Sequence, residues 1–283
     1  MANIRLDHHS AARGAADGAS SWIEMLARVG YASRGVLYII IGALAFTLAI
    51  GSGGETTGSR GALQEIADKP LGNVALFVIA LGLAGYGVWR LIQAAANPQR
   101  LGDSVKDAFK RAGYALRGVI HVGLAVAAVR IAMGSRSSDG GESSQQTESW
   151  TARVMEWPAG RWLVAIAAAI MIGYGLYRIY QAWKADLGKQ MRVAEMSRET
   201  SRRIIHVSRF GIAARGVVFV LVGWLFMQAA LQYDASEAGG VAEALDSLRS
   251  QPYGPWLLGV VALGLVAYGV HSILQSRYRR IDV

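Results

Sequence analysis

Residues 74–89 read VALFVIALGLAGYGVW, and residues 162–177 read WLVAIAAAIMIGYGLY. Neither stretch has the polar face that a helix on the surface of a soluble domain carries. A helix that crosses the hydrocarbon core of a membrane needs about 20 mostly apolar residues. Six stretches of the chain meet this requirement, and none of them contains Asp or Glu. We therefore expect an all-α, polytopic integral membrane protein with six transmembrane helices, at Tyr31–Ile50, Gly72–Ala94, Tyr114–Met133, Gly160–Ala182, Gly211–Gln232 and Gly254–Gln275.

The composition excludes several classes of protein. The chain has 283 residues, of which 53% are hydrophobic and 17% are charged, and it has no cysteine. The lack of cysteine excludes a disulfide scaffold, a cysteine nucleophile and a thiolate metal site. The sequence has no metalloprotease, phosphate-loop or hydrolase-elbow motif, and no acid–base pair lies at catalytic spacing within the spans. We expect a protein that is not an enzyme and that binds no cofactor or metal.

The basic residues indicate how the chain crosses the membrane. Loops on the side of the two termini hold 17 Lys and Arg against 9 Asp and Glu, and loops on the other side hold 5 against 11. Loops rich in Lys and Arg stay in the cytoplasm. We therefore expect a multi-pass protein of the bacterial cytoplasmic (inner) membrane with both termini in the cytoplasm. The sequence pI near 10 reflects this topology and does not indicate a nucleic-acid partner.

Two sequence motifs occur three times each, once per pair of spans. The first, R-x-G-x-A-x-R-G-V, begins at Arg28, Arg111 and Arg209. The second begins with P-x-G at Pro70, Pro158 and Pro252, and each time it leads at the same spacing to Tyr-Gly and then to Gln. Each repeat is therefore a hairpin of two spans, and all three hairpins have the same orientation. Parallel repeats of this kind predict a pseudo-threefold bundle.

The repeats divide the chain into four segments. These are an N-terminal cytoplasmic segment (1–26), repeat 1 (27–96), repeat 2 (97–184), and repeat 3 with a short cytoplasmic tail (185–283). Basic amphipathic stretches before the third and fifth spans are expected at the inner membrane surface. On the outer side, GALQEIADKP, TARVMEWP and VAEALDSLRSQP each predict a short helix that ends at the proline. Residues 134–149, GSRSSDGGESSQQTES, predict a flexible polar loop. Residues 1–20 lack an apolar core, so the first span is expected to direct insertion without a cleavable signal peptide.

With these two motifs the chain resembles a family of bacterial membrane proteins catalogued as a domain of unknown function, built from a two-helix unit that usually occurs three times. The resemblance covers about residues 27–276. It implies the fold and the membrane location, and it carries no established activity. The third repeat departs from the pattern, with Ile212 in place of tyrosine and Ser272 in place of arginine.

The second arginine of the first motif is the main candidate for a binding site. Arg34, Arg117 and Arg215 lie about one turn inside their spans, near the cytoplasmic edge. They could anchor the helices at the interface or bond to the helix-end carbonyls of a neighbouring hairpin. Alternatively they form a basic ring around the pseudo-threefold axis that binds an anion or a lipid phosphate, because a guanidinium matches phosphate bidentately. Arg90 and Arg178 are candidates for the same ligand.

The tyrosines of the second motif, Tyr86, Tyr174 and Tyr268, lie in the inner third of their helices. A buried phenol needs a hydrogen-bond partner. The Arg-Gly segment of a neighbouring hairpin lies at the same depth, so we expect each tyrosine to form a clasp with an arginine or a backbone group of that segment, with a substrate-lining role as the alternative. The glycine after each arginine should let neighbouring helices approach closely. The glutamines of the second motif are expected at the interface: Gln93, Gln181 and Gln275.

Two further polar residues lie within the third span. Arg130 is 13 residues beyond Arg117, where the other repeats have Thr47 and Gln228. The three side chains predict either a hydrated outer vestibule or, for Arg130, a side chain that reaches out to the membrane surface. His121 has aromatic counterparts in the other repeats, which favours aromatic-sized packing over a metal ligand.

These observations leave two functional hypotheses. The first is a non-enzymatic membrane module whose basic cytoplasmic face binds anionic membrane lipids or a protein partner. The second is a transporter or channel for an anion or a small neutral solute along the pseudo-threefold axis. The lack of Asp and Glu in the spans opposes proton or cation coupling by carboxylates.

Overall fold

The computed structural model describes residues 4–53, 55–96, 102, 104–135, 141–184 and 198–278. Within these ranges the chain consists of helices and short connections, without a strand. Six helices are long and apolar enough to cross a membrane, which confirms the six predicted spans and the all-α fold. They are α1 (Ile4–Ala49), α3 (Gly72–Ala95), α4 (Val105–Ala132), α6 (Gly160–Lys184), α8 (Arg198–Gln232) and α10 (Gly254–Tyr278).

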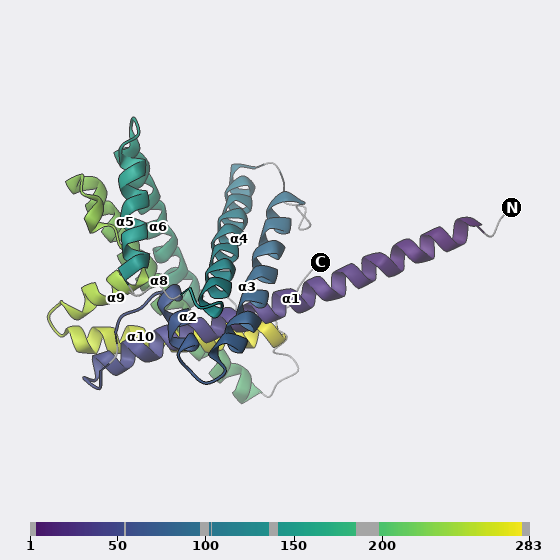
Figure 1. Cartoon of the computed structure of the whole chain (residues 1–283), viewed down its shortest axis with the longest axis horizontal. Helices are drawn as coiled ribbons and strands as arrows, with labels where there is room; N and C mark the ends of the chain where they lie inside the picture. Colours follow the sequence, from purple (N-terminus) through teal and green to yellow (C-terminus); the bar gives the residue numbers. More distant parts are fainter. Residues whose placement is uncertain are drawn as a thin grey trace.

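Shorter helices occupy the connection within each repeat. They are α2 (Ser59–Ala67), α5 (Gly141–Met155), the 3₁₀ helix η2 (Ala235–Glu237) and α9 (Val241–Arg249). We call the end of the molecule that carries these connections the hairpin end. The opposite end, where α3 and α6 finish and α4 and α8 begin, is the linker end. Figure 1 shows α1 extending well beyond the other helices toward the N-terminus.

Two predictions about the connections were wrong in part. Residues 141–149, which were expected in a flexible loop, form the first half of α5. Its polar side chains are compatible with a helix because Ser149 and Thr151 donate hydrogen bonds to carbonyls one turn earlier. The basic amphipathic stretches are the first turns of the long helices α4 and α8 and not separate segments. Residues 189–197 of the second stretch lie outside the described part.

The P-x-G motif forms the same tight turn in all three repeats. Its middle residue is left-handed each time, with φ of 61° at Leu71, 63° at Ala159 and 60° at Tyr253. The glycine amide then bonds to the carbonyl three residues earlier at 2.8 Å in every copy. A Cβ atom at this glycine would lie about 2 Å from a backbone carbonyl oxygen of the preceding short helix. Only glycine therefore lets the second span begin directly against the short helix.

The repeats join one another through three equivalent helix pairs. The first span of each repeat packs on the second span of another: α1 on α10, α4 on α3, and α8 on α6. In every pair the glycine of Arg-Gly meets the glycine of Tyr-Gly, so that an added Cβ would lie about 3 Å from the facing carbonyl oxygen. This confirms the predicted close approach of helices at these glycines. The pairs are Gly35 with Gly269, Gly118 with Gly87, and Gly216 with Gly175.

The expected pseudo-threefold bundle is complete on two sides and open on the third. The two spans of repeat 1, α1 and α3, pack on each other, and so do α8 and α10 of repeat 3. In repeat 2, α4 and α6 make no more than marginal contact and diverge in Figure 1. The physical reason is a pair of bulky side chains, Leu116 and Ile170, where the other repeats have small residues.

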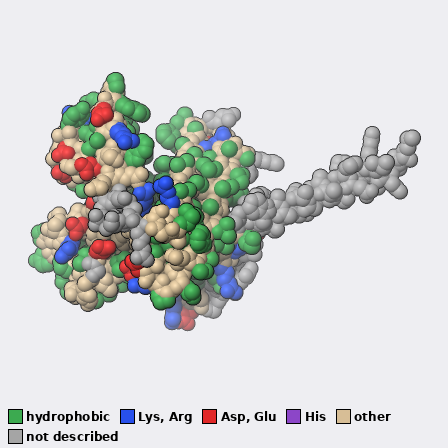
Figure 2. All heavy atoms as spheres, viewed as in Figure 1, with side chains coloured by type: hydrophobic (Ala, Val, Ile, Leu, Met, Phe, Trp, Pro, Cys, Tyr) green, Lys and Arg blue, Asp and Glu red, His purple; other side chains and the backbone are tan. Residues whose placement is uncertain are grey.

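Apolar side chains form the core and cover the exterior. The main buried cluster draws on α1, α3, α4, α8 and α10, together with the short helices α2 and α9. Figure 2 shows hydrophobic side chains over much of the visible surface of the helices. Acidic side chains in this view gather mainly toward the hairpin end. An apolar exterior of this extent fits a protein surrounded by lipid.

Candidate functional site

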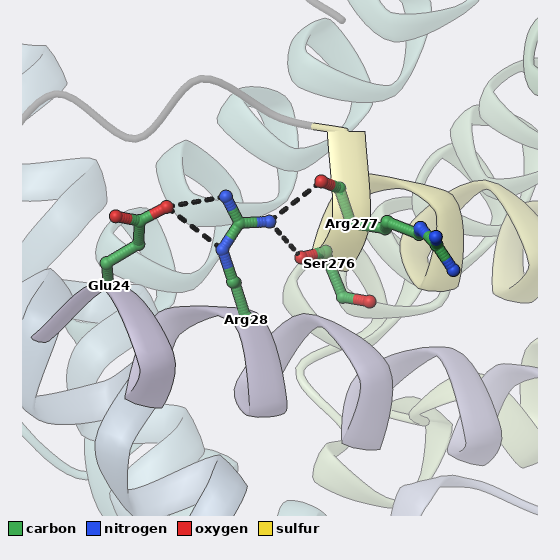
Figure 3. Close-up of polar contacts among 4 residues, drawn as sticks. All are labelled: Glu24, Arg28, Ser276 and Arg277. Atoms are coloured by element: carbon green, nitrogen blue, oxygen red, sulfur yellow. Dashed lines mark hydrogen bonds and ion pairs between the residues drawn. The ribbon is translucent and has the colours of Figure 1, made fainter. Parts of the chain in front are cut away.

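In repeats 1 and 2 the first arginine of the first motif caps a neighbouring helix. Arg28 donates from Nη1 to the carbonyl oxygens of Ser276 and Arg277, at 2.6 and 2.8 Å, in the last turn of α10 (Figure 3). Its Nε also bonds to the carboxylate of Glu24 at 3.0 Å. Arg111 donates in the same way to the carbonyl oxygen of Ala94 at the end of α3, at 2.9 Å. Carbonyls in the last turn of a helix have no partner within that helix, so these arginines stabilise the pairing of repeats.

The second arginine of the motif does not take this capping role in repeats 1 and 3, so this option, one of those predicted for it, is wrong there. Arg34 instead donates from Nη1 to the hydroxyl of Tyr86 at 3.2 Å. Arg215 donates from Nη1 to the hydroxyl of Tyr268 at 2.9 Å. In both cases arginine and tyrosine lie on the two spans of one repeat. The predicted clasp between tyrosine and arginine is thus confirmed in repeats 1 and 3, but it forms within one hairpin and not, as expected, with a neighbouring hairpin.

Each of these two guanidinium groups also bonds across a repeat boundary. Arg34 donates from Nη2 to the hydroxyl of Ser272 at 3.3 Å and to Oε1 of Gln275 at 3.4 Å, both on α10. Arg215 donates from Nε to the hydroxyl of Tyr38 on α1 at 2.9 Å. The position at which the third repeat departs from the motif, Ser272, therefore still contributes a polar partner.

Arg90 on α3 belongs to the same group of side chains. It is 5% exposed and donates to the hydroxyls of Tyr86 and Tyr31, both at 3.0 Å, and to Oε1 of Gln93 at 2.6 Å. Gln93 and Gln275 are buried, so these two glutamines pack within the bundle, and their position at the membrane interface stays a prediction. Their signal in the sequence was the spacing of three residues from an arginine or a serine on the same helix face.

The second repeat contributes the loosest part of this group. The guanidinium of Arg117 approaches the ring of Tyr174, with its Cζ 5.9 Å from the ring centroid, in place of the hydrogen bond found in the other repeats. Arg178 donates from Nη1 to Oε1 of Gln181. All four side chains are only half-buried. This arrangement follows from the divergence of α4 and α6.

We refer to these side chains as the arginine–tyrosine cluster. It comprises Arg34, Arg90, Arg117, Arg178, Arg215, Tyr31, Tyr38, Tyr86, Tyr174, Tyr268, Ser272, Gln93, Gln181 and Gln275. The ion pairs formed by the described residues all lie outside it. Five guanidinium groups thus face neutral phenols, amides and a hydroxyl. Burying a cation without a counter-charge is costly, so the cluster is electrostatically suited to an anion.

One buried atom of the cluster has no hydrogen-bond partner. Arg34 is 9% exposed, and its Nε is buried without an acceptor. A buried donor that lacks an acceptor costs about 1–3 kcal/mol. Arg34 lies between two repeats and shares the hydroxyl of Tyr86 as an acceptor with Arg90, so the two guanidinium groups lie close together.

The remaining candidates lie apart from one another. The ring of His121 packs 4.7 Å from the ring of Tyr86, which confirms its predicted aromatic-sized packing. Arg130 is exposed in the last turn of α4. Thr47 donates its hydroxyl to the carbonyl of Leu44 on its own helix. A hydrated vestibule shared by Arg130 and its counterparts stays a prediction.

A cavity that the sequence did not suggest lies at the hairpin end. It has a volume of about 280 Å³ and is lined by the first residues of α2 and α9, by part of α5 and by Leu124 of α4. All three repeats therefore contribute to it. Buried apolar side chains occupy the spans between this end and the arginine–tyrosine cluster, among them Leu37 and Ile41 of α1 and Val218 and Val222 of α8. Among the described residues, no three His, Asp or Glu side chains are placed to hold a metal ion.

Comparison with other proteins agrees with the repeats. The sequence matches the Domain of Unknown Function (DUF1206) three times, over residues 29–97, 112–185 and 210–279. It is also 30% identical over 260 residues to the uncharacterized protein YxxB of Bacillus subtilis (strain 168), which covers 92% of each chain. No solved structure matches. The three matched segments correspond to the three helix hairpins, and the chain belongs to the DUF1206 family.

Proposed function

We propose that this protein is a non-enzymatic module of the bacterial inner membrane that binds an anionic phospholipid. In this proposal the linker end faces the cytoplasm, as the excess of Lys and Arg in the loops of that side indicates. The arginine–tyrosine cluster holds the lipid phosphate. The basic residues around the linker end add a weaker attraction of about 1 kcal/mol each toward an anionic surface.

The observation that carries the proposal is the unbalanced charge of the cluster. Five arginines share the inner part of the spans with neutral partners only, and Arg34 keeps a buried Nε without an acceptor. A phosphate oxygen is an acceptor that also carries the missing negative charge. Hydrogen bonds between guanidinium and phosphate are short and about twice as strong as neutral ones.

The depth of the cluster agrees with a lipid head group. Arg34 is seven residues beyond the start of the first span at Ala27, and Arg90 is five residues before the end of the second at Ala95. At about 1.5 Å per residue these positions lie roughly 8–11 Å inside the helix ends. An arginine side chain can bridge this distance toward the phosphate layer.

The cavity at the hairpin end supports a second candidate function, a transporter of an anion or a small neutral solute. It is formed by all three repeats, as the mouth of an axial pathway would be. The buried apolar residues between the cavity and the cluster oppose a continuous hydrated path, and we rank this candidate second. Single cysteines at Tyr86 and Thr47 separate the two. Rapid labelling of both by a membrane-impermeant thiol reagent would favour transport, and protection of both would favour a dry bundle.

The lipid proposal is tested with the full-length protein in nanodiscs that contain phosphatidylglycerol and phosphatidylcholine in equal amounts. The lipid that stays bound after release is identified by native mass spectrometry. We expect enrichment of phosphatidylglycerol for the wild type. Arg34→Gln should reduce the enrichment about tenfold, since loss of a charged hydrogen bond costs about 1.5–3 kcal/mol.

Two variants serve as controls for this experiment. Arg34→Lys retains the charge and should keep part of the enrichment. Arg203→Gln removes an exposed arginine that forms an ion pair with Glu199, and it should behave as the wild type. Equal retention of both lipids by the wild type, or equal loss in Arg34→Gln and Arg203→Gln, would refute the proposal. Selective retention of a protein instead of lipid would point to a protein partner and would also count against it.

A further inference from the structure

The second repeat differs from the other two at one contact. In repeat 1, a Cβ on Gly82 would lie 2.4 Å from Oγ of Ser33, and in repeat 3 a Cβ on Gly264 would lie 2.1 Å from Cβ of Ala214. These small residues let the two spans of each hairpin touch. They occupy fixed positions in the motifs: one residue before the second arginine, and four residues before the tyrosine.

At the same two positions repeat 2 has Leu116 and Ile170. Two large side chains cannot occupy the space of a glycine facing serine or alanine, because protein interiors have no room for additional methylene groups. The helices diverge instead, and Leu116 is 63% and Ile170 58% exposed. We call the resulting gap between α4 and α6 the repeat-2 seam.

The first glycine of the R-x-G-x-A-x-R-G-V motif also differs between repeat 2 and the other two repeats in its contact with the second span. A Cβ on Gly30 would lie 2.3 Å from Cβ of Tyr86, and one on Gly211 would lie 2.3 Å from the backbone nitrogen of Tyr268. A Cβ on Gly113, the counterpart in repeat 2, would have nothing within 4 Å. The opening therefore extends along α4 to the level of the linker end.

Cationic side chains line the seam toward the linker end. Arg117 reaches toward the ring of Tyr174 on α6, so its guanidinium lies where the seam meets the arginine–tyrosine cluster. Arg178 lies one turn beyond Tyr174 on α6. Both arginines are half-buried, whereas Arg34 and Arg90 are enclosed. Access to the cluster from the side of the bundle is therefore easiest at this point.

We propose that the repeat-2 seam is a lateral opening that binds an anionic phospholipid. One acyl chain of the lipid lies between Leu116 and Ile170, and the lipid phosphate binds Arg117 and Arg178. This inference rests on the proposed function and specifies the route and the repeat that it uses. The side chains that line the seam indicate its occupant. They are apolar along the helices and cationic at the linker end, so they complement an anionic amphiphile in the cytoplasmic leaflet.

A second copy of the chain or a foreign helix fits the seam less well. Either would cover the apolar walls but would leave the guanidinium groups of Arg117 and Arg178 without a negative partner. Within the six described spans, Asp and Glu occur only at the first residue of two of them, Asp107 and Glu199, so a second copy would bring no acid to this depth. A lipid phosphate supplies the charge at the correct end of an apolar chain.

The first experiment closes the seam. The double variant Leu116→Ser, Ile170→Gly installs the small pair of repeat 1. The matched control Leu81→Gly, Leu263→Ser removes two exposed apolar side chains from α3 and α10. The probe is phosphatidylglycerol with a photoactivatable diazirine on one acyl chain, reconstituted with the full-length protein, and labelled peptides are identified by mass spectrometry.

We expect label on α4 and α6 in the wild type and in the control. In the closing variant the label on these helices should fall at least about tenfold. This is the change in affinity expected when an acyl chain loses the burial of two or more methylene groups. Uniform labelling of all six spans in the wild type would overturn the inference. So would undiminished labelling of α4 and α6 in the closing variant.

The second experiment measures the opening itself and does not depend on lipid binding. The chain has no cysteine, so each introduced pair is unique. Ser33→Cys with Gly82→Cys should form a disulfide readily, since their positions are in contact. Leu116→Cys with Ile170→Cys should form one slowly or not at all. Equal rates for both pairs would show a closed second hairpin and would refute the seam.

The two proposals can fail separately. If Arg34→Gln abolishes the preference for phosphatidylglycerol while the closing variant retains it, the cluster binds lipid but the seam is not its route. If neither variant alters lipid binding, both proposals fail. A third outcome combines an open seam in the cysteine experiment with equal labelling by phosphatidylglycerol and phosphatidylcholine probes. A lipid would then occupy the seam without selection by charge, and the inference would also be refuted.

Discussion

The motif glycines Gly30, Gly113 and Gly211 occupy equivalent positions, and alanine substitutions there should have opposite effects. In an exposed helical position, replacing glycine by alanine stabilises by about 0.5–1 kcal/mol, because glycine has more conformational freedom in the unfolded chain. A methyl group added at Gly113 would have no neighbouring atom within 4 Å, so Gly113→Ala should show this gain without a penalty.

The other two substitutions force helices apart. The added methyl at Gly211 would lie 2.3 Å from the backbone nitrogen and 2.6 Å from Cα of Tyr268. At Gly30 it would lie 2.3 Å from Cβ of Tyr86 and 2.7 Å from the carbonyl oxygen of Gly82. Ordinary contacts of this kind are longer by about 1 Å, and overpacking of a core costs about 1–3 kcal/mol. After the helical gain is subtracted, we expect Gly211→Ala and Gly30→Ala to destabilise by up to about 2 kcal/mol.

The assay is reversible unfolding of the purified protein in mixed micelles, followed by tryptophan fluorescence. The free energies of unfolding of Gly113→Ala and Gly211→Ala should differ by roughly 1–3 kcal/mol, with opposite signs relative to the wild type. Destabilisation by Gly113→Ala of the same size as by Gly30→Ala would mean that α4 packs on α6 as α1 packs on α3. The second hairpin would then be closed like the first, without a seam.

Three further predictions concern other parts of the molecule. Ala159→Gly should raise the free energy of unfolding by up to about 1 kcal/mol in the same assay, because glycine adopts the left-handed conformation of this turn position without the steric strain of a Cβ. A decrease in the free energy of unfolding would contradict this prediction. Arg28→Met should accelerate amide exchange in the last turn of α10 and lower the free energy of unfolding by about 1–2 kcal/mol. The control Arg203→Met, at an exposed surface ion pair, should change neither quantity. Equal effects of the two substitutions would exclude the capping role of Arg28. The hydroxyl and the amide of Ser236 donate hydrogen bonds to Asp234 and lower its pKa below the usual 3.8. The local stability from these bonds is therefore present above pH 3.8 and is lost as the pH falls through the lowered pKa. The protection of the Ser236 amide against hydrogen exchange should decrease over the same pH range, and this pH dependence should be absent in Asp234→Asn.

Much of the fold follows from sequence because the membrane leaves few alternatives. An apolar stretch of about 20 residues must satisfy its backbone hydrogen bonds internally, so helices were the expected form of all six spans. The repeated motifs also predicted which residues recur at the helix contacts. The glycines after Arg34 and after Tyr86 lie at such contacts because only the absence of a side chain permits backbones to approach closely.

The candidate site was predictable in its residue types but not in its connections. The sequence indicated that Tyr86 and Arg34 lie at a similar depth, and the structure joins them by a hydrogen bond. It did not indicate that Arg28 would take the capping role or that Gln93 would be buried against Arg90. A side chain as long as arginine can reach partners on several neighbouring helices, so its position along the chain does not select one of them.

The sequence by itself determined the helices, their number and the threefold recurrence of glycine, arginine and tyrosine, because each depends on local composition and spacing. Only the tertiary structure decided that the three hairpins are unequal. Leu116 and Ile170 are ordinary residues of a membrane span when each is considered alone. They separate α4 from α6 because they occupy the two positions that would face each other across one hairpin, and such a coincidence is a property of helix packing in three dimensions.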